Sequence, residues 1–99
     1  MEKIILIANI SILPGFEEEI KKAIITLATE TRKEAGCELF LVNTRNDSPQ
    51  KIVFYEIYLD QEAFDQHGTY VHTQQFFEIV KGKIENAKPE VIFLTTLAS

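Results

Sequence analysis

The 99-residue sequence has a single cysteine, no tryptophan and no long apolar run. One cysteine rules out an internal disulfide framework and suits a reducing compartment. A membrane-spanning helix needs about 18 apolar residues or more, but the apolar stretch Ile4–Leu13 is interrupted by Asn9 and Ser11. Pro14-Gly15 and three glutamates follow that stretch in place of a small-residue cleavage site, so we interpret it as a strand and not as a targeting segment. We therefore expect a cytoplasmic protein that does not interact with membranes.

The sequence also lacks an excess of basic residues. Ten lysines and arginines are scattered among fifteen acidic residues, which gives a net charge of −5. Binding to nucleic acid requires clustered basic side chains, so we expect no nucleic-acid partner. The sequence contains no phosphate-binding loop, dinucleotide fingerprint or Ser-His-Asp signature. It contains no linker or repeat either, and its ordinary composition predicts one globular domain over residues 1–99.

The apolar pattern predicts four strands and three helical segments. The predicted strands cover residues 4–13, 37–43, 51–59 and 90–97, and the predicted helices cover residues 16–35, a short segment N-capped by Asp60, and residues 71–86. The resulting order is β-α-β-β-α-β, which is the ferredoxin-like arrangement. We thus predict an α+β fold with an antiparallel four-stranded sheet and helices on one face.

The predicted strands are apolar on both faces, although helices can cover only one. In the first strand Ile5 and Ile7 point to one face, whereas Leu6, Ile10 and Ile12 point to the other. A strand that is apolar on both faces is normally buried on both, and a second copy of the chain is the simplest cover. We therefore predict a homodimer joined through the helix-free faces. We assign Leu6, Ile10 and Ile12 to that interface, with the opposite assignment left open.

Several segments resemble the antibiotic biosynthesis monooxygenase family. They are Pro14-Gly15 before an acidic helix, Glu34–Cys37 at the start of a strand, and Tyr55–Asp60 followed by Ala63, His67, His72 and Phe76. The resemblance implies a dimeric α/β barrel in which two sheets pack face to face. The family includes cofactor-free oxygenases of quinols and aromatic polyketides, haem-degrading enzymes and an isomerase, so the fold alone does not decide the reaction.

His67 and His72 are the only histidines, and we take them as the first candidates for proton transfer because histidine titrates near neutral pH. The alternative for His72 is a buried histidine bonded to a backbone carbonyl, and for His67 a helix-end cap. On one continuous helix a spacing of five residues would place them about 140° apart. No cysteine or further acid stands nearby in the sequence, so we predict no metal site.

Asn9 and Glu56 are polar residues within apolar strands. A buried amide must be hydrogen-bonded, so Asn9 either satisfies a neighbouring backbone group or orients a substrate oxygen. The resemblance favours the second role, because some oxygenases of the family have an asparagine on this strand. Glu56 shares a face with Ile52, Phe54 and Tyr58. We expect it either to pair with Arg45 or Lys51 or to have a pKa raised by burial.

Aromatic side chains are available to line a cavity for a small aromatic substrate, and we name Tyr58, Phe40, Phe76 and Phe77, with Glu56, as candidate substrate-binding residues. The first hypothesis is a cofactor-free monooxygenase that acts on a quinol and O₂, with His72 or His67 as the base and Asn9 as its polar partner. The same groups could isomerise a substrate through an enolate. A second hypothesis is a non-catalytic small-molecule binder or stress protein.

The resemblance also predicts that the protein does not bind haem. The haem-degrading members use an asparagine on the first strand, a tryptophan and an iron-ligating histidine. Asn9 matches the asparagine, but His67 stands at the tryptophan position and Phe77 near that of the ligating histidine. Because an axial ligand is the protein's main hold on haem iron, we expect no haem. The sequence also lacks a dinucleotide fingerprint, and we expect no other cofactor.

Overall fold

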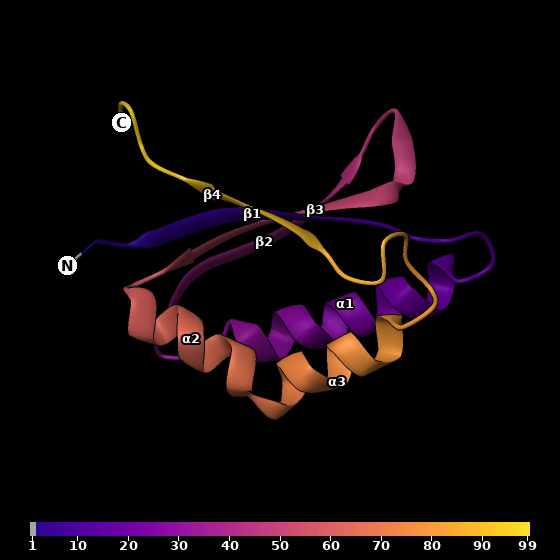
Figure 1. Cartoon of the computed structure of the whole chain (residues 1–99), viewed down its shortest axis with the longest axis horizontal. Coiled ribbons are helices and arrows are strands. Elements are labelled where there is room, and N and C mark those ends of the chain that lie inside the picture. The colour runs from indigo at the N-terminus through magenta and orange to yellow at the C-terminus, as the bar shows by residue number, and fades with distance from the viewer. Residues whose placement is uncertain (1) are drawn as a thin grey trace.

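The computed structural model describes residues 2–99, which form one sheet and one layer of helices. The elements are β1 (Ile4–Ser11), α1 (Glu17–Thr31), β2 (Cys37–Arg45), β3 (Ser48–Tyr58), α2 (Gln61–Thr69), α3 (Val71–Val80) and β4 (Glu90–Leu94). The strands are antiparallel in the order β2-β3-β1-β4, and the three helices lie on one side of them (Figure 1). The predicted α+β, ferredoxin-like fold is confirmed.

Two helices are shorter than the sequence pattern predicted. The helix α3 ends at Val80 and not near Asn86, because Lys81 leaves the helical region and Gly82 has a φ of +72°. The helix α1 ends at Thr31, and tight turns follow in place of a last helical turn. In these turns the Glu34 N–H donates to the Thr31 carbonyl at 3.0 Å. Glu34 therefore lies on a turn beyond the helix.

Gly36 fixes the position of that turn by close packing. A Cβ atom at Gly36 would lie 2.4 Å from the Cβ of Ala63, far inside van der Waals contact. The Leu59 N–H also donates to the Gly36 carbonyl at 2.9 Å. Gly36 is not among the residues with a positive φ, so the close contact with Ala63, and not its backbone conformation, requires a glycine here. Its role is to let the turn after α1 contact α2 at Ala63.

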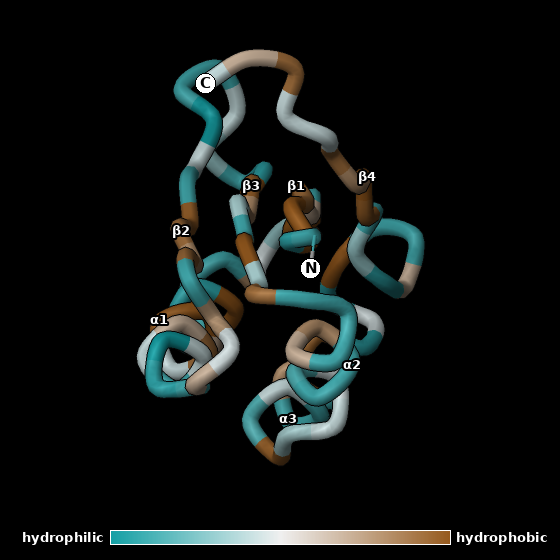
Figure 2. The backbone as a smooth tube through the Cα atoms, turned by 90° about the vertical axis from the view of Figure 1, so that its left-hand side faces the viewer, coloured by the Kyte–Doolittle hydropathy of each residue, from teal (hydrophilic) through white to brown (hydrophobic). Residues whose placement is uncertain are grey.

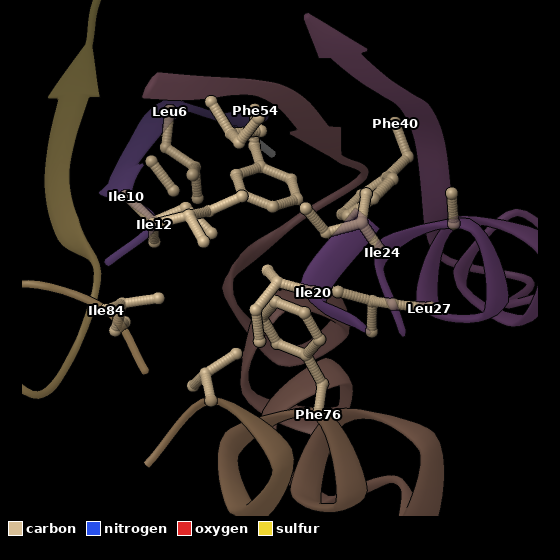
Figure 3. Close-up of a cluster of buried hydrophobic side chains, with 14 of the residues drawn as sticks. Leu6, Ile10, Ile12, Ile20, Ile24, Leu27, Phe40, Phe54, Phe76 and Ile84 are labelled. Carbon is tan, nitrogen blue, oxygen red and sulfur yellow. The ribbon is translucent and has the colours of Figure 1, made fainter. Parts of the chain in front are cut away.

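The hydrophobic core lies between the sheet and the helices. Phe54 and Phe40 extend from the sheet toward Ile20, Leu27 and Phe76 on the helices (Figure 3). The short helix α2 starts where the sequence predicted, because the Asp60 side chain accepts a hydrogen bond from the Ala63 N–H at 2.8 Å.

The face assigned above to Leu6, Ile10 and Ile12 is the helix-covered face, so that assignment is wrong. These three side chains are 2–4% exposed and belong to the core. The outward face carries the alternate residues of each strand, and the strand register aligns them in rows. One row is Leu41, Tyr55, Ile7 and Ile92, and the next is Leu39, Ile57, Ile5 and Leu94. No helix among residues 2–99 covers these rows, and Figure 2 shows the strands side by side with the helices on one side only.

Candidate functional site

A cavity of about 320 Å³ lies between the sheet and the helices α2 and α3. Most of its wall is apolar, and the aromatic part consists of Phe40, Phe54, Phe64, Phe76 and Phe77. The polar side chains in the wall are Glu56, Asp65, His67 and Thr73. A small, mainly apolar cavity with few polar groups is typical of a site for a small molecule.

His67 belongs to a buried network with Glu34 and His72. His67 Nδ1 lies 2.8 Å from Glu34 Oε2, and His72 Nε2 lies 2.6 Å from the same oxygen. The Glu34 side chain is only 5% exposed, and the two imidazoles are 13% and 17% exposed. A carboxylate accepts hydrogen bonds and cannot donate them, so both ring nitrogens donate. This arrangement leaves Nε2 of a neutral His67 without a proton and able to accept one.

Aromatic rings hold both imidazoles in place. The ring of Tyr58 lies 5.0 Å from that of His67, and the ring of Phe40 lies 6.2 Å from it, measured between centroids. Tyr70 stacks on His72 at 5.4 Å with an angle of 15° between the rings. The network is therefore fixed by packing as well as by hydrogen bonds, as an acid–base site requires.

Glu56 is a second buried carboxyl group, and it contributes to the cavity wall. Tyr58 donates a hydrogen bond to Glu56 Oε1 at 2.7 Å. Burial raises the pKa of Glu56 to about 7, since desolvation outweighs the opposite effect of the Tyr58 hydrogen bond, and Glu34 raises it further. Of the two expectations for Glu56, the raised pKa is confirmed. Among residues 2–99 neither Arg45 nor Lys51 pairs with it, and Arg45 pairs instead with Asp47.

Thr73 adds a polar atom that the sequence analysis missed. Its Oγ1 is buried and has no hydrogen-bond partner among residues 2–99, and the residue lies in the cavity wall. A buried hydroxyl without a partner is costly, so it is a candidate contact for a ligand oxygen. The position of Thr73 directly after His72 gave no sign of this role, because threonine is also common on buried helix faces.

The structure brings together most of the predicted site residues. His67, Glu56, Phe40, Phe76 and Phe77 all line the cavity. Two other predicted residues lie behind its wall: Tyr58 is fully buried, and His72 borders a separate surface hollow.

Asn9 does not lie at this cavity, so its expected position is wrong. It occupies the outward face of β1, beside Glu90 and Val53 in the strand register. Its Nδ2 donates to Glu90 Oε1 at 3.1 Å. The error is one of strand parity, because successive residues of a strand point to opposite faces and Ala8, its neighbour, is the one that lines the cavity.

The two histidines come together because they do not share one continuous helix. The chain leaves the helical region at Tyr70, and His67 and His72 lie on different helices, as the two predicted helical segments allowed. The ring centroids are 6.3 Å apart. The acid that joins them, Glu34, comes from a turn more than thirty residues earlier, so no local spacing could have revealed it.

The fold and the cavity define a small α+β protein with an antiparallel sheet and a single layer of helices. The sequence profile of the family named antibiotic biosynthesis monooxygenase matches residues 3–79. The chain therefore belongs to the antibiotic biosynthesis monooxygenase family, as its motifs suggested. The matched range contains Glu34, Glu56 and both histidines and ends before β4. No helix among residues 2–99 is long and apolar enough to span a membrane.

Solved structures with the same fold cover nearly the whole chain. A crystal structure of an antibiotic biosynthesis monooxygenase has a TM-score of 0.89 and 20% identity, covering 96% of this chain and 99% of the other. A protein from Pseudomonas aeruginosa has a TM-score of 0.91 and 23% identity, with coverages of 99% and 97%. A protein from Shewanella oneidensis is 28% identical, with a TM-score of 0.84 and coverages of 94% and 91%. No curated protein matches the chain.

Proposed function

We propose that this chain is a cofactor-independent monooxygenase that oxidises a small quinol-type aromatic with O₂. The observation that carries the proposal is the position of His67. Its ring lies in the wall of an apolar cavity, while its Nδ1 is bound to the buried carboxylate of Glu34. This pairing fixes the tautomer and stabilises the imidazolium that forms when Nε2 accepts a proton.

A quinol suits this cavity because it supplies all the electrons of the reaction. Insertion of one oxygen atom into the ring and oxidation of the quinol to a quinone together release four electrons. These reduce O₂ to the inserted oxygen and one water, so no external reductant is needed. Deprotonation of the hydroxyl makes the substrate a better reductant, and His67 Nε2 is the group that takes this proton.

The remaining wall orients the substrate. The phenylalanine rings provide flat apolar contact, and the unpartnered hydroxyl of Thr73 donates to the phenolate oxygen. Glu56 acts from the same wall, and in its protonated form it can donate to a second substrate oxygen. Aromatic packing with two or three convergent polar groups is how small pockets orient a ring.

The protein works as a homodimer in the cytoplasm. The two apolar rows on the outward face include Leu41, Ile92 and Leu94, which are 38–46% exposed. An uncovered patch of this kind is unusual on a monomer, and an identical sheet packed against it covers both copies at once. A reducing compartment agrees with the free thiol of Cys37, whose pKa burial raises to about 11.

Oxygen uptake by the purified protein tests the proposal. A panel of reduced benzo- and naphthoquinols is supplied in the presence of a chelator, and uptake is compared with uncatalysed autoxidation. We expect His67→Gln to reduce kcat by about 10²- to 10⁴-fold, the usual contribution of a general base. Glu38→Gln is the control, because Glu38 is exposed, pairs with Lys3 and does not line the cavity. The absence of uptake above autoxidation, or equal rates for wild type and His67→Gln, would exclude the proposed function.

A further inference from the structure

Two imidazole nitrogens and one carboxylate oxygen converge where the turn after α1 meets α2 and α3. The three donor atoms, Glu34 Oε2, His67 Nδ1 and His72 Nε2, all lie within 4.8 Å of one another. They come from three different segments of the chain. Two histidines and one carboxylate are a ligand set that divalent first-row transition metals favour when positions remain open for water or another ligand.

We propose that Glu34, His67 and His72 form a binding site for one divalent transition-metal ion of the Zn²⁺ type. The distances require little rearrangement. Bonds of about 2.0 Å in a tetrahedral site place ligand atoms about 3.3 Å apart. The two histidine nitrogens lie 2.8 and 2.6 Å from the Glu34 oxygen. Each histidine nitrogen therefore needs to move away from the Glu34 oxygen by less than about 1 Å to admit the ion.

The charge of the cluster favours a cation. The Glu34 side chain is 5% exposed, and among residues 2–99 no lysine or arginine pairs with it. A buried carboxylate that lacks a permanent positive partner is unfavourable. A divalent ion would supply that charge and displace the two N–H protons that now point at the oxygen.

The surroundings meet two further requirements of a metal site. Tyr58 and Phe40 pack around His67 and Tyr70 stacks on His72, so the rings are already oriented. His72 also borders a surface hollow lined by Glu19 and Gln75, which gives an ion a route from solvent. Ligands held in place and a path for the ion are both expected of a working site.

Metal binding and base catalysis exclude each other at His67. A metal on Nδ1 moves the ring proton to Nε2, which then donates and no longer accepts. The metal-bound protein would therefore lack the base of the proposed oxygenase, and this is why the oxygen-uptake assay includes a chelator. The binding proposal itself does not depend on the oxygenase, because it is tested without substrate.

The test is a titration of chelator-stripped, dialysed protein with Co²⁺, followed by its visible d–d absorption, and with Zn²⁺ by calorimetry. We expect one ion per chain and the intense bands of four- or five-coordinate Co²⁺. Glu34→Gln and His72→Gln should each weaken binding by more than the roughly 10- to 100-fold that loss of a supporting residue costs. His72→Gln retains an N–H donor for Glu34, so we expect it to fold even if Glu34→Gln does not. Circular dichroism checks that each variant is folded.

Two control variants test whether side chains other than the three proposed ligands bind the ion. Glu38→Gln removes an exposed acid that pairs with Lys3, and Cys37→Ser removes the nearby thiol. Both should bind Co²⁺ as the wild type does, and Zn²⁺ should raise the Tm of both but not that of folded His72→Gln. Binding that survives in His72→Gln, is lost in Cys37→Ser, or is absent from the wild type would overturn the proposal.

Discussion

The two faces of the sheet carry similar apolar rows, yet only one face is covered by the chain's own helices. On the helix side Leu6, Ile52 and Phe54 are at most 3% exposed. On the outward side Leu41 and Ile92 are 46% and 44% exposed. Alternate residues of the same strands form the two faces, so the strand propensity of the segments is the same for both. Strand propensity therefore cannot explain why apolar residues are buried on one face and exposed on the other. The exposed apolar rows of the outward face are therefore the feature that supports the proposed pairing with a second copy.

In a monomeric sheet the covered face is apolar and the exposed face is polar. Here the covered face contains a buried carboxyl group, and the outward face is largely apolar. The covered face contains the Glu56 carboxyl among apolar side chains. The outward face has its polar residues at one end of the apolar rows, with Asn43, Asn9 and Glu90 in one row and Ser11 and Lys51 in the next. A carboxyl group kept in a core has a cost in stability, and the proposed role of Glu56 in the cavity accounts for its presence there.

The largest expected effect comes from placing a charge on the outward face. In Ile7→Glu a carboxylate would be buried in the proposed interface without a partner, at a cost of several kcal/mol. Since each 1.4 kcal/mol is a factor of ten, the dimer Kd should rise by about 100-fold or more. Sedimentation velocity measures this. Ile25→Glu, at a 67% exposed position on α1, is the matched control and should remain dimeric. A monomeric wild type at micromolar concentration would refute the dimer.

Adjacent residues of β3 allow a direct comparison of the two faces. Ile52 is 2% exposed on the helix side, and Val53 is on the outward side. In the Ile7→Glu background, where the outward face stays uncovered, we expect Ile52→Ala to cost about 2–5 kcal/mol. Val53→Ala should cost about 1 kcal/mol or less. Urea unfolding measures both, and equal losses would show that the faces do not differ as described.

Glu56 should make stability depend on pH. Its folded-state pKa of about 7 is higher than its ordinary value of 4.5 because burial disfavours the carboxylate. Below pH 4.5 it is protonated in both states and costs nothing. As the pH rises toward 7 the unfolded state ionises first, so stability falls by at most about 3 kcal/mol and then levels off. Glu56→Gln should remove this fall, as measured by urea unfolding at pH 4.5–8.

The exposed Glu38→Gln serves as the control for that measurement, and it should keep the pH dependence of the wild type. The Glu56 prediction fails if the difference in stability between wild type and Glu56→Gln is the same at pH 4.5 and pH 8.

The smallest expected effect is for haemin. Adding it to the apoprotein should leave the Soret absorption of haemin unchanged. The helix-side cavity has a volume of about 320 Å³, and the position near which the family's haem-degrading members carry their iron ligand is occupied by Phe77. We expect no stoichiometric Soret shift, because no axial ligand stands there. A sharp 1:1 shift that disappears in His67→Ala or His72→Ala would show that these histidines bind iron from another direction.

The sequence predicted the elements well because their signals are local. Alternating apolar residues marked the strands, and Asp60 marked the start of α2. The sequence predicted the wrong face for Asn9, because the covered face of a strand depends on the side on which the helices pack. An error of one residue moves every side chain of the strand to the opposite face. The sequence failed for Glu34 because the turn that positions this residue depends on the contact between Gly36 and Ala63, which are distant in the chain.

The inner position of β1 has a consequence for how the protein is made. Ile7 pairs with Tyr55 and with Ile92, which follow it by 48 and 85 residues. Of these strands β1 thus leaves the ribosome before both of its neighbours, and the later neighbour, β4, ends at Leu94. Contacts between such distant segments slow folding, and an unpaired apolar strand is prone to aggregate in the interval. Until residues 90–94 have been synthesised, β1 therefore leaves unpaired the edge that β4 occupies in the folded domain.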